Sequence, residues 1–165
     1  MRTSLPVEFG STVIGRHDKA RPYFLQAVIF APEDTPYDSG AFLFDVFCPP
    51  DYPKVPPKVN LMTTGGGRVR FNPNLYKNGK VCLSLLGTWR GGTASEGWTD
   101  SSTLTQVLVS IQSLIFVKFP YFNEPGVESQ MGTAAGTEGA RYAENGGYEQ
   151  LRVATVRWAM RDVLE

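Results

Sequence analysis

Residues 70–89 read R-F-N-P-N-L-Y-K-N-G-K-V-C-L-S-L-L-G-T-W, and this stretch holds the residues with the most obvious chemistry in the chain. Cys82 is one of only two cysteines, and the amide residue Asn74 lies eight positions upstream of it. Between them, Asn78 and Gly79 favour a tight turn because both residue types tolerate a positive φ. The sequence therefore predicts a chain that turns sharply between Asn74 and Cys82.

Three strands are predicted before this stretch. Residues 23–30 are rich in aromatic and β-branched side chains, which favour a strand. In residues 41–47 every second residue is apolar, so that one face of the predicted strand is entirely apolar. The same alternation resumes in residues 58–63. Because the links between these segments are short, we expect an antiparallel meander.

The segments between and before the strands are predicted to be turns or extended chain. Residues 32–40 are dense in turn formers, and residues 48–57 contain five prolines, which exclude a helix or a central strand. Residues 1–21 show no helical period and are predicted to be extended or loop. The glycines at 65–67 lack the rest of a phosphate-binding motif, so they are also interpreted as a turn.

Two helices are predicted after the stretch. The first begins at a cap residue, Ser102 or Thr103, and its apolar stripe consists of Leu104, Val107, Leu108, Ile111, Leu114 and Ile115. Trp89 and Trp98 are expected to anchor the polar loop before it. The second helix runs from Tyr148 to the last residue on the spacing of Val153, Val156, Met160 and Val163, and a shorter helix is expected near Ala140. Strands first and helices after indicate an α+β fold.

Length and charge narrow the possible classes of protein. We interpret residues 1–165 as a single domain. The second predicted helix is still running at Glu165 without a C-cap, and the N-terminus has no obvious start, so we expect the sequence to be a piece of a longer chain. Lys+Arg and Asp+Glu number 16 each, which argues against a dominant electrostatic grip on nucleic acid or membranes. No apolar run has the length of a membrane span, and no signal peptide is recognisable. Two cysteines without a secretion signal favour free thiols and a cytoplasmic location, with the nucleus as an alternative.

Several kinds of cysteine chemistry fit this composition poorly. A cysteine protease needs a histidine base, and the only histidine, His17, lies between Arg16 and Asp18 in a segment that reads as surface. A zinc site needs more cysteines and histidines than the chain has, and a redox site would prefer C-x-x-C. Cys82 is then either an acyl carrier without its own base or an inert core thiol, and the residue pattern by itself leaves both open.

Four segments, in this order along the chain, resemble the ubiquitin-conjugating enzymes. They are YFLQAVIFAPEDTPYDSG at 23–40, FCPPDYPKVPPKV at 47–59, FNPNLYKNGKVCL at 71–83 and PYFNEPG at 120–126. The last two segments resemble more narrowly the corresponding sequences of a large subgroup, the conjugating/ligase hybrid enzymes, which includes the giant inhibitor-of-apoptosis ubiquitin-conjugating enzyme. The resemblance implies an antiparallel sheet of about four strands packed against helices. The family's N-terminal helix is not recognisable in residues 1–21.

The resemblance also implies an activity. Cys82 would accept ubiquitin from the ubiquitin-activating enzyme as a thioester and pass it to a substrate lysine or to a ligase, without a cofactor or metal. Asn74 matches the family's asparagine, whose amide would hold the loop and stabilise the oxyanion; otherwise it is a turn residue that bonds to local backbone. Glu124 falls near the family's acidic residue that orients the incoming lysine; otherwise it is an exposed loop acid.

Other positions match or depart from the family pattern. Asn72 stands where the family usually has a histidine with a mainly structural role, and Pro73 and Leu83 are expected to support the site. Leu83 and Leu86 should pack beneath it. Lys54 replaces a large apolar residue common in members that bind RING ligases, which disfavours ordinary RING docking. Two alternatives remain open, namely an inactive module that binds ubiquitin or a partner, and a carrier for a ubiquitin-like modifier.

Overall fold

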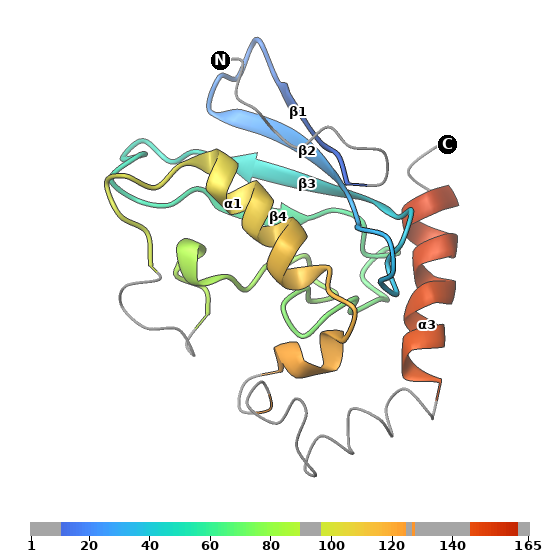
Figure 1. Ribbon diagram of the computed structural model, residues 1–165. Coiled ribbons are helices and arrows are strands. Elements are labelled where there is room, and N and C mark those ends of the chain that lie inside the picture. Colours follow the sequence, from blue (N-terminus) through green and yellow to red (C-terminus); the bar gives the residue numbers. More distant parts are fainter. Residues whose placement is uncertain (1–10, 90–96, 125–126, 128–145, 162–165) are drawn as a thin grey trace.

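The protein contains a four-stranded antiparallel sheet in the order β1-β2-β3-β4, with helices against it (Figure 1). The computed structural model describes residues 11–89, 97–124, 127 and 146–161. The strands are β1 (Val13–His17), β2 (Phe24–Phe30), β3 (Ala41–Phe47) and β4 (Lys58–Leu61). The predicted meander and the α+β class are therefore confirmed.

The register of the sheet explains which side chains form the core. In β2, Leu25 and Ile29 are buried, and they pair with Val46 and Phe42 of β3. Because successive side chains in a strand point to opposite faces, this one face gathers the apolar side chains. The opposite face carries partly exposed residues such as Gln26, whose amide donates to the Asp45 carboxylate at 2.9 Å.

Strand β1 lies in the segment that was predicted to be extended or loop. It pairs with β2 from Val13–Ile29 to His17–Leu25, but only Val13 among its five residues is buried. A strand with one buried side chain shows no apolar alternation, so its pairing with β2 is what defines it. His17 is exposed, as expected for a surface histidine.

Helix α1 (Leu104–Ser110) continues as a π-type turn, Ile111–Ile115, and begins at Thr103 as predicted. Thr103 and Gln106 form a capping box, in which the Gln106 N–H donates to Thr103 Oγ1 at 3.2 Å and the Thr103 N–H donates to Gln106 Oε1 at 2.8 Å. Leu114, which the helical spacing placed in the core stripe, is 59 % exposed. The wider π turn rotates this position away from the sheet.

The C-terminal helix α3 (Gly147–Ala154) also continues as a π-type turn, Thr155–Arg161, and stands at one end of the sheet (Figure 1). The valines at 153 and 156, whose spacing predicted this helix, face solvent. Its inner face consists instead of Thr155 and Ala159, which are almost fully buried, and of the half-buried Leu151, Ala154 and Trp158, which pack against the core. The helix expected near Ala140 lies outside the described residues.

Trp98, which was predicted to anchor the loop before α1, contacts the proline-rich link after β3. The indole N–H donates to the Pro53 carbonyl at 2.7 Å, and its ring centroid is 5.8 Å from that of Tyr52. Trp89 is only half-buried, and Lys54 is exposed. In the described residues, no helix is both long enough and apolar enough to cross a membrane.

Candidate active site

The stretch at 70–89 folds back on itself and lies against β4. Gly79 has a φ of 87°, and its N–H donates to the Tyr76 carbonyl at 2.9 Å, which closes the turn predicted at Asn78-Gly79. The Gly79 carbonyl then accepts from the Leu61 N–H at 2.8 Å, so the turn is tied to the end of β4. A bridge between Leu75 and Val81 brings Asn74 and Cys82 to the same place.

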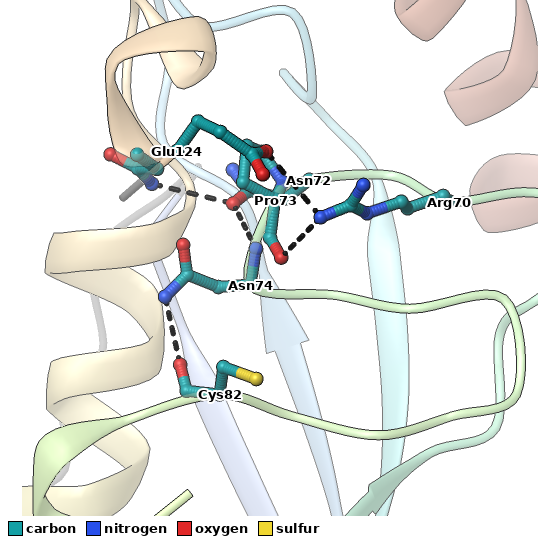
Figure 2. Close-up of polar contacts among 7 residues, drawn as sticks. Arg70, Asn72, Pro73, Asn74, Cys82 and Glu124 are labelled. Atoms are coloured by element: carbon teal, nitrogen blue, oxygen red, sulfur yellow. Dashed lines mark hydrogen bonds and ion pairs between the residues drawn. The ribbon is translucent and has the colours of Figure 1, made fainter. Parts of the chain in front are cut away.

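Asn74 and Cys82 exchange two hydrogen bonds. The Asn74 side-chain Nδ2 donates to the Cys82 carbonyl at 2.9 Å (Figure 2). The Cys82 N–H donates to the Asn74 carbonyl, also at 2.9 Å. The Cys82 sulfur points away from the Asn74 amide in this view. The buried Asn74 Oδ1 has no hydrogen-bond partner among the described residues. The two hydrogen bonds fix the main chain of Cys82. The Asn74 Nδ2 donates only one of its two hydrogens to the Cys82 carbonyl, which leaves the other for a further acceptor.

Cys82 is a free thiol, and the residue is 4 % exposed. It follows Val81 and precedes Leu83, and both of these side chains belong to the core. Cys48, the other cysteine, is also free, so the two do not form a disulfide. Burial raises the pKa of the Cys48 thiol above its usual range, because a thiolate is poorly solvated there.

Asn72 is buried and supports the site from beneath. Its Nδ2 donates to the Tyr37 hydroxyl at 3.0 Å and to the Ile115 carbonyl at 2.8 Å. Its Oδ1 accepts from the Asn74 N–H at 2.9 Å. The Tyr37 hydroxyl in turn donates to the Phe71 carbonyl at 2.7 Å. These hydrogen bonds connect the link between β2 and β3 to Asn74, and all the groups in them are uncharged. The position and contacts of Asn72 are those of a residue that orders the loop around Asn74.

Glu124 follows the 3-10 turn η4 (Pro120–Asn123) and contacts Arg70 rather than the cysteine. The Arg70 Nη2 lies 3.5 Å from the Glu124 carboxylate and donates to the Pro73 carbonyl at 2.9 Å. Figure 2 shows Asn74 between Glu124 and Cys82. Of the predicted site residues, Asn74 and Cys82 are in direct contact. Glu124 and Pro73 are connected because both contact the Arg70 side chain.

The remaining predicted support residues are buried in the core. Leu83 and Leu86 are 5 % and 7 % exposed, and Leu86 ends the 3-10 turn η1 (Ser84–Leu86). The Leu83 N–H donates to Thr88 Oγ1 at 3.0 Å, and this hydroxyl donates to the Val81 carbonyl at 2.7 Å. Thr88 thus holds the chain on both sides of the cysteine, a contact that depends on the η1 turn and had no signal in the residue spacing.

A cavity of about 440 Å³ lies beside the same stretch, and Cys82 is not among its lining residues. Its lining combines the Arg70–Glu124 pair with apolar side chains, namely Phe71, Pro73, Pro120, Tyr121 and Leu151. Among the described residues, no three His, Cys, Asp or Glu side chains gather as they would around a metal ion.

This fold and this signature stretch define a class of protein. A solved structure, the E2 domain of a Toxoplasma gondii ubiquitin-conjugating enzyme, superimposes with a TM-score of 0.63 at 25 % identity, covering 89 % of this chain and 88 % of that one. The family model for ubiquitin-conjugating enzymes matches residues 10–146. The chain belongs to the ubiquitin-conjugating enzyme family.

Curated relatives agree with this assignment. The chain is 51 % identical over 160 residues to the human dual E2 ubiquitin-conjugating enzyme/E3 ubiquitin-protein ligase BIRC6, which covers 97 % of this chain and 3 % of that protein. It is 48 % identical over 162 residues to the probable ubiquitin-conjugating enzyme protein 17 of Caenorhabditis elegans, covering 98 % and 22 %. For human ubiquitin-conjugating enzyme E2 Z the identity is 50 % over 130 residues, covering 79 % and 34 %. The chain therefore spans only a small part of the relatives it matches.

Proposed function

We propose that Cys82 carries ubiquitin as a thioester, received from the ubiquitin-activating enzyme and passed to a substrate lysine or a ligase cysteine. The observation that carries this proposal is the reciprocal pair of hydrogen bonds between Asn74 and Cys82, at 2.9 Å each. They hold the main chain of Cys82, a free cysteine, beside the Asn74 amide, which has a second N–H for a further acceptor. An inert core thiol needs no such arrangement.

The chemistry proceeds in two balanced exchanges. In loading, the Cys82 thiolate attacks the thioester carbonyl on the activating enzyme, a new C–S bond forms, and the activating enzyme's thiolate leaves. In transfer to lysine, the neutral amine attacks that carbonyl, the C–N bond forms, the C–S bond breaks, and the amine loses a proton to solvent. Each tetrahedral intermediate carries negative charge on one oxygen, which an N–H donor such as Asn74 stabilises.

The proposal extends to partners and location. Ubiquitin, the activating enzyme and protein substrates are the partners that this chemistry requires, and a ligase is an alternative acceptor. A thiol that must remain reduced fits the cytoplasm or the nucleus. The exposed Lys54 on the proline-rich link supports substrate transfer without ordinary RING docking.

A charging assay tests the proposal directly. The chain is mixed with activating enzyme, ubiquitin and ATP and is run on a non-reducing gel. We expect a band heavier by one ubiquitin that disappears with reductant and is absent from the Cys82→Ala variant, whereas Cys48→Ala retains it. No such band from a chain extended at its N-terminus would favour the inactive binding module. Replacing ubiquitin with ubiquitin-like modifiers in the same reaction tests the other alternative.

A further inference from the structure

Arg70 joins three parts of the site that are separate in the sequence. Its Nη2 donates to the Pro73 carbonyl at 2.9 Å, and its guanidinium carbon lies 4.5 Å from the ring centroid of Tyr76. The same Nη2 is 3.5 Å from the Glu124 carboxylate, which comes from the end of η4, 54 residues further along the chain. Arg70 therefore connects the signature stretch to the segment that carries Glu124.

Arg70 is the fixed partner of this pair. The carbonyl of Pro73 and the ring of Tyr76 hold its guanidinium whether or not Glu124 is present. The backbone of Glu124 is also held, because its N–H donates to the Tyr121 carbonyl at 3.2 Å and its carbonyl accepts from the Val127 N–H at 3.2 Å. Among the described residues, Arg70 is the side chain that contacts the Glu124 carboxylate.

The contact leaves part of the carboxylate available. Only Glu124 Oε2 approaches Arg70, and Oε1 has no polar contact among the described residues. The two side chains are 42 % and 48 % exposed, so solvent and other ions reach them. A carboxylate oriented by a fixed cation, with one oxygen open to solvent, is suited to receiving a second cation.

We propose that Arg70 is a positioning residue for transfer to lysine, which acts by holding the Glu124 carboxylate where it binds the ammonium group of the incoming lysine. This inference rests on the proposed function. A lysine side chain is protonated at neutral pH, with a pKa of about 10.4, so it approaches as a cation and loses its proton to solvent before attack. Without Arg70 the carboxylate turns into solvent and the ammonium binds less well.

Two small nucleophiles separate this role from a structural one. The charged chain is freed of activating enzyme and ATP, and loss of the thioester is followed at increasing concentrations of free lysine or of hydroxylamine. Lysine carries a positive charge under these conditions, whereas hydroxylamine is uncharged near neutral pH. For Arg70→Gln we expect the lysine concentration at half-maximal rate to rise about two- to fivefold, as for an exposed ion pair, with the maximal rate unchanged. The hydroxylamine reaction should keep its wild-type rate.

Three further variants complete the design. Arg70→Lys keeps the charge and should restore lysine transfer toward wild type. Arg70→Gln should have no added effect in a Glu124→Gln background. Arg16→Gln is the matched control for loss of one arginine, because the Arg16 side chain lies on β1 and takes part in none of the polar contacts of the site; both of its reactions should match wild type.

The opposing results are equally distinct. Equal losses with lysine and hydroxylamine would mean that Arg70 only supports the loop, and the inference would be overturned. An unchanged lysine dependence, or an effect that persists without Glu124, would also overturn it. In all these cases the wild-type thioester forms, whereas failure of the proposed function would show as no thioester at all.

Discussion

Asn74 illustrates how much a single side chain contributes at this site. One of its amide hydrogens is donated to the Cys82 carbonyl, and its own backbone N–H is donated to Asn72 Oδ1. An ordering role and an oxyanion role are therefore compatible, because Nδ2 carries two hydrogens. Asn72 has only the first role, since both of its amide groups are occupied within the protein.

Replacing Asn74 by Ala should separate loading from transfer. We expect Asn74→Ala to form the thioester with ubiquitin but to pass it to free lysine more slowly, by about 100-fold or more, as for other oxyanion donors. The measurement is thioester loss after the activating enzyme is quenched. Asn78→Ala, in the exposed turn of the same stretch, is the matched control and should transfer normally. A normal transfer rate for Asn74→Ala would show that its amide does not stabilise the oxyanion.

The other cysteine permits a test of pH dependence. Burial raises the pKa of the Cys48 thiol, so the folded state keeps the thiol proton to a higher pH than the unfolded chain does. Its contribution to stability is complete below the unfolded pKa and is lost as pH rises through the folded pKa. Because the thiolate is the reactive form, alkylation of Cys48 should also require a higher pH in the folded chain.

Iodoacetamide labelling of the Cys82→Ser variant would measure this effect. We expect the pH of half-maximal labelling rate to be higher in buffer than in denaturant, where Cys48 is solvated. Identical pH profiles in the two conditions would contradict the role of burial.

At the scale of elements, the turn at Gly79 connects the signature stretch to the sheet. A Cβ at this position would lie 2.7 Å from the Leu61 carbonyl and would also meet the Asn60 side chain. Because Leu61 belongs to β4, the stretch could accept a larger residue only by moving away from the sheet. The positive φ of 87° adds a second cost for any residue with a side chain.

Two glycine substitutions distinguish these costs. Gly66 also has a positive φ, +67°, but a Cβ there would meet no atom within 4 Å. We expect Gly66→Ala to lower the free energy of unfolding by about 1 kcal/mol, from backbone strain alone. Gly79→Ala should cost about 1–3 kcal/mol more because of the steric overlap. Urea unfolding of both variants provides the comparison, and equal losses would mean that the close approach at β4 is unimportant.

The success of prediction from the sequence differed between elements for physical reasons. Strands β2 and β3 were predicted to within one residue because their alternation reflects one buried face. Strand β1 was not, because four of its five residues are exposed. The Asn74–Cys82 contact followed from a local turn. The Arg70–Glu124 and Tyr37–Asn72 contacts join segments 54 and 35 residues apart, so they depend on the tertiary fold and left no local pattern.

At the scale of the whole molecule, the C-terminal helix packs closely against the rest of the protein because glycines lie opposite two of its side chains. A Cβ on Gly40, immediately before β3, would lie 2.7 Å from the Thr155 methyl group and 2.8 Å from the Tyr37 carbonyl. A Cβ on Gly65 would lie 2.9 Å from the Trp158 ring. The helix therefore approaches both loops at glycines, and one of these loops contains Tyr37, which bonds to Asn72 beneath the site.

Adding a methyl group at Gly40 should disturb this arrangement. We expect Gly40→Ala to lower the free energy of unfolding by about 1–3 kcal/mol, because Tyr37, Phe42 and Thr155 all crowd the new atom. Gly15→Ala is a suitable control, since its Cβ would meet only Leu25 at an ordinary 3.5 Å. Denaturant unfolding monitored by tryptophan fluorescence would show the difference. Similar stabilities for the two variants would contradict the close packing of helix and loop.

The paired hydrogen bonds of Cys82 also bear on how a nearly enclosed sulfur could do its work. Both polar groups of its peptide backbone are bonded to one neighbour, Asn74, so the main chain that carries the sulfur is held in place. Because Cys82 is only 4 % exposed, the sulfur can take up a cargo only after a movement of its own side chain or of the side chains around it. Whatever that movement is, the two bonds to Asn74 confine it to side chains and leave the loop itself folded.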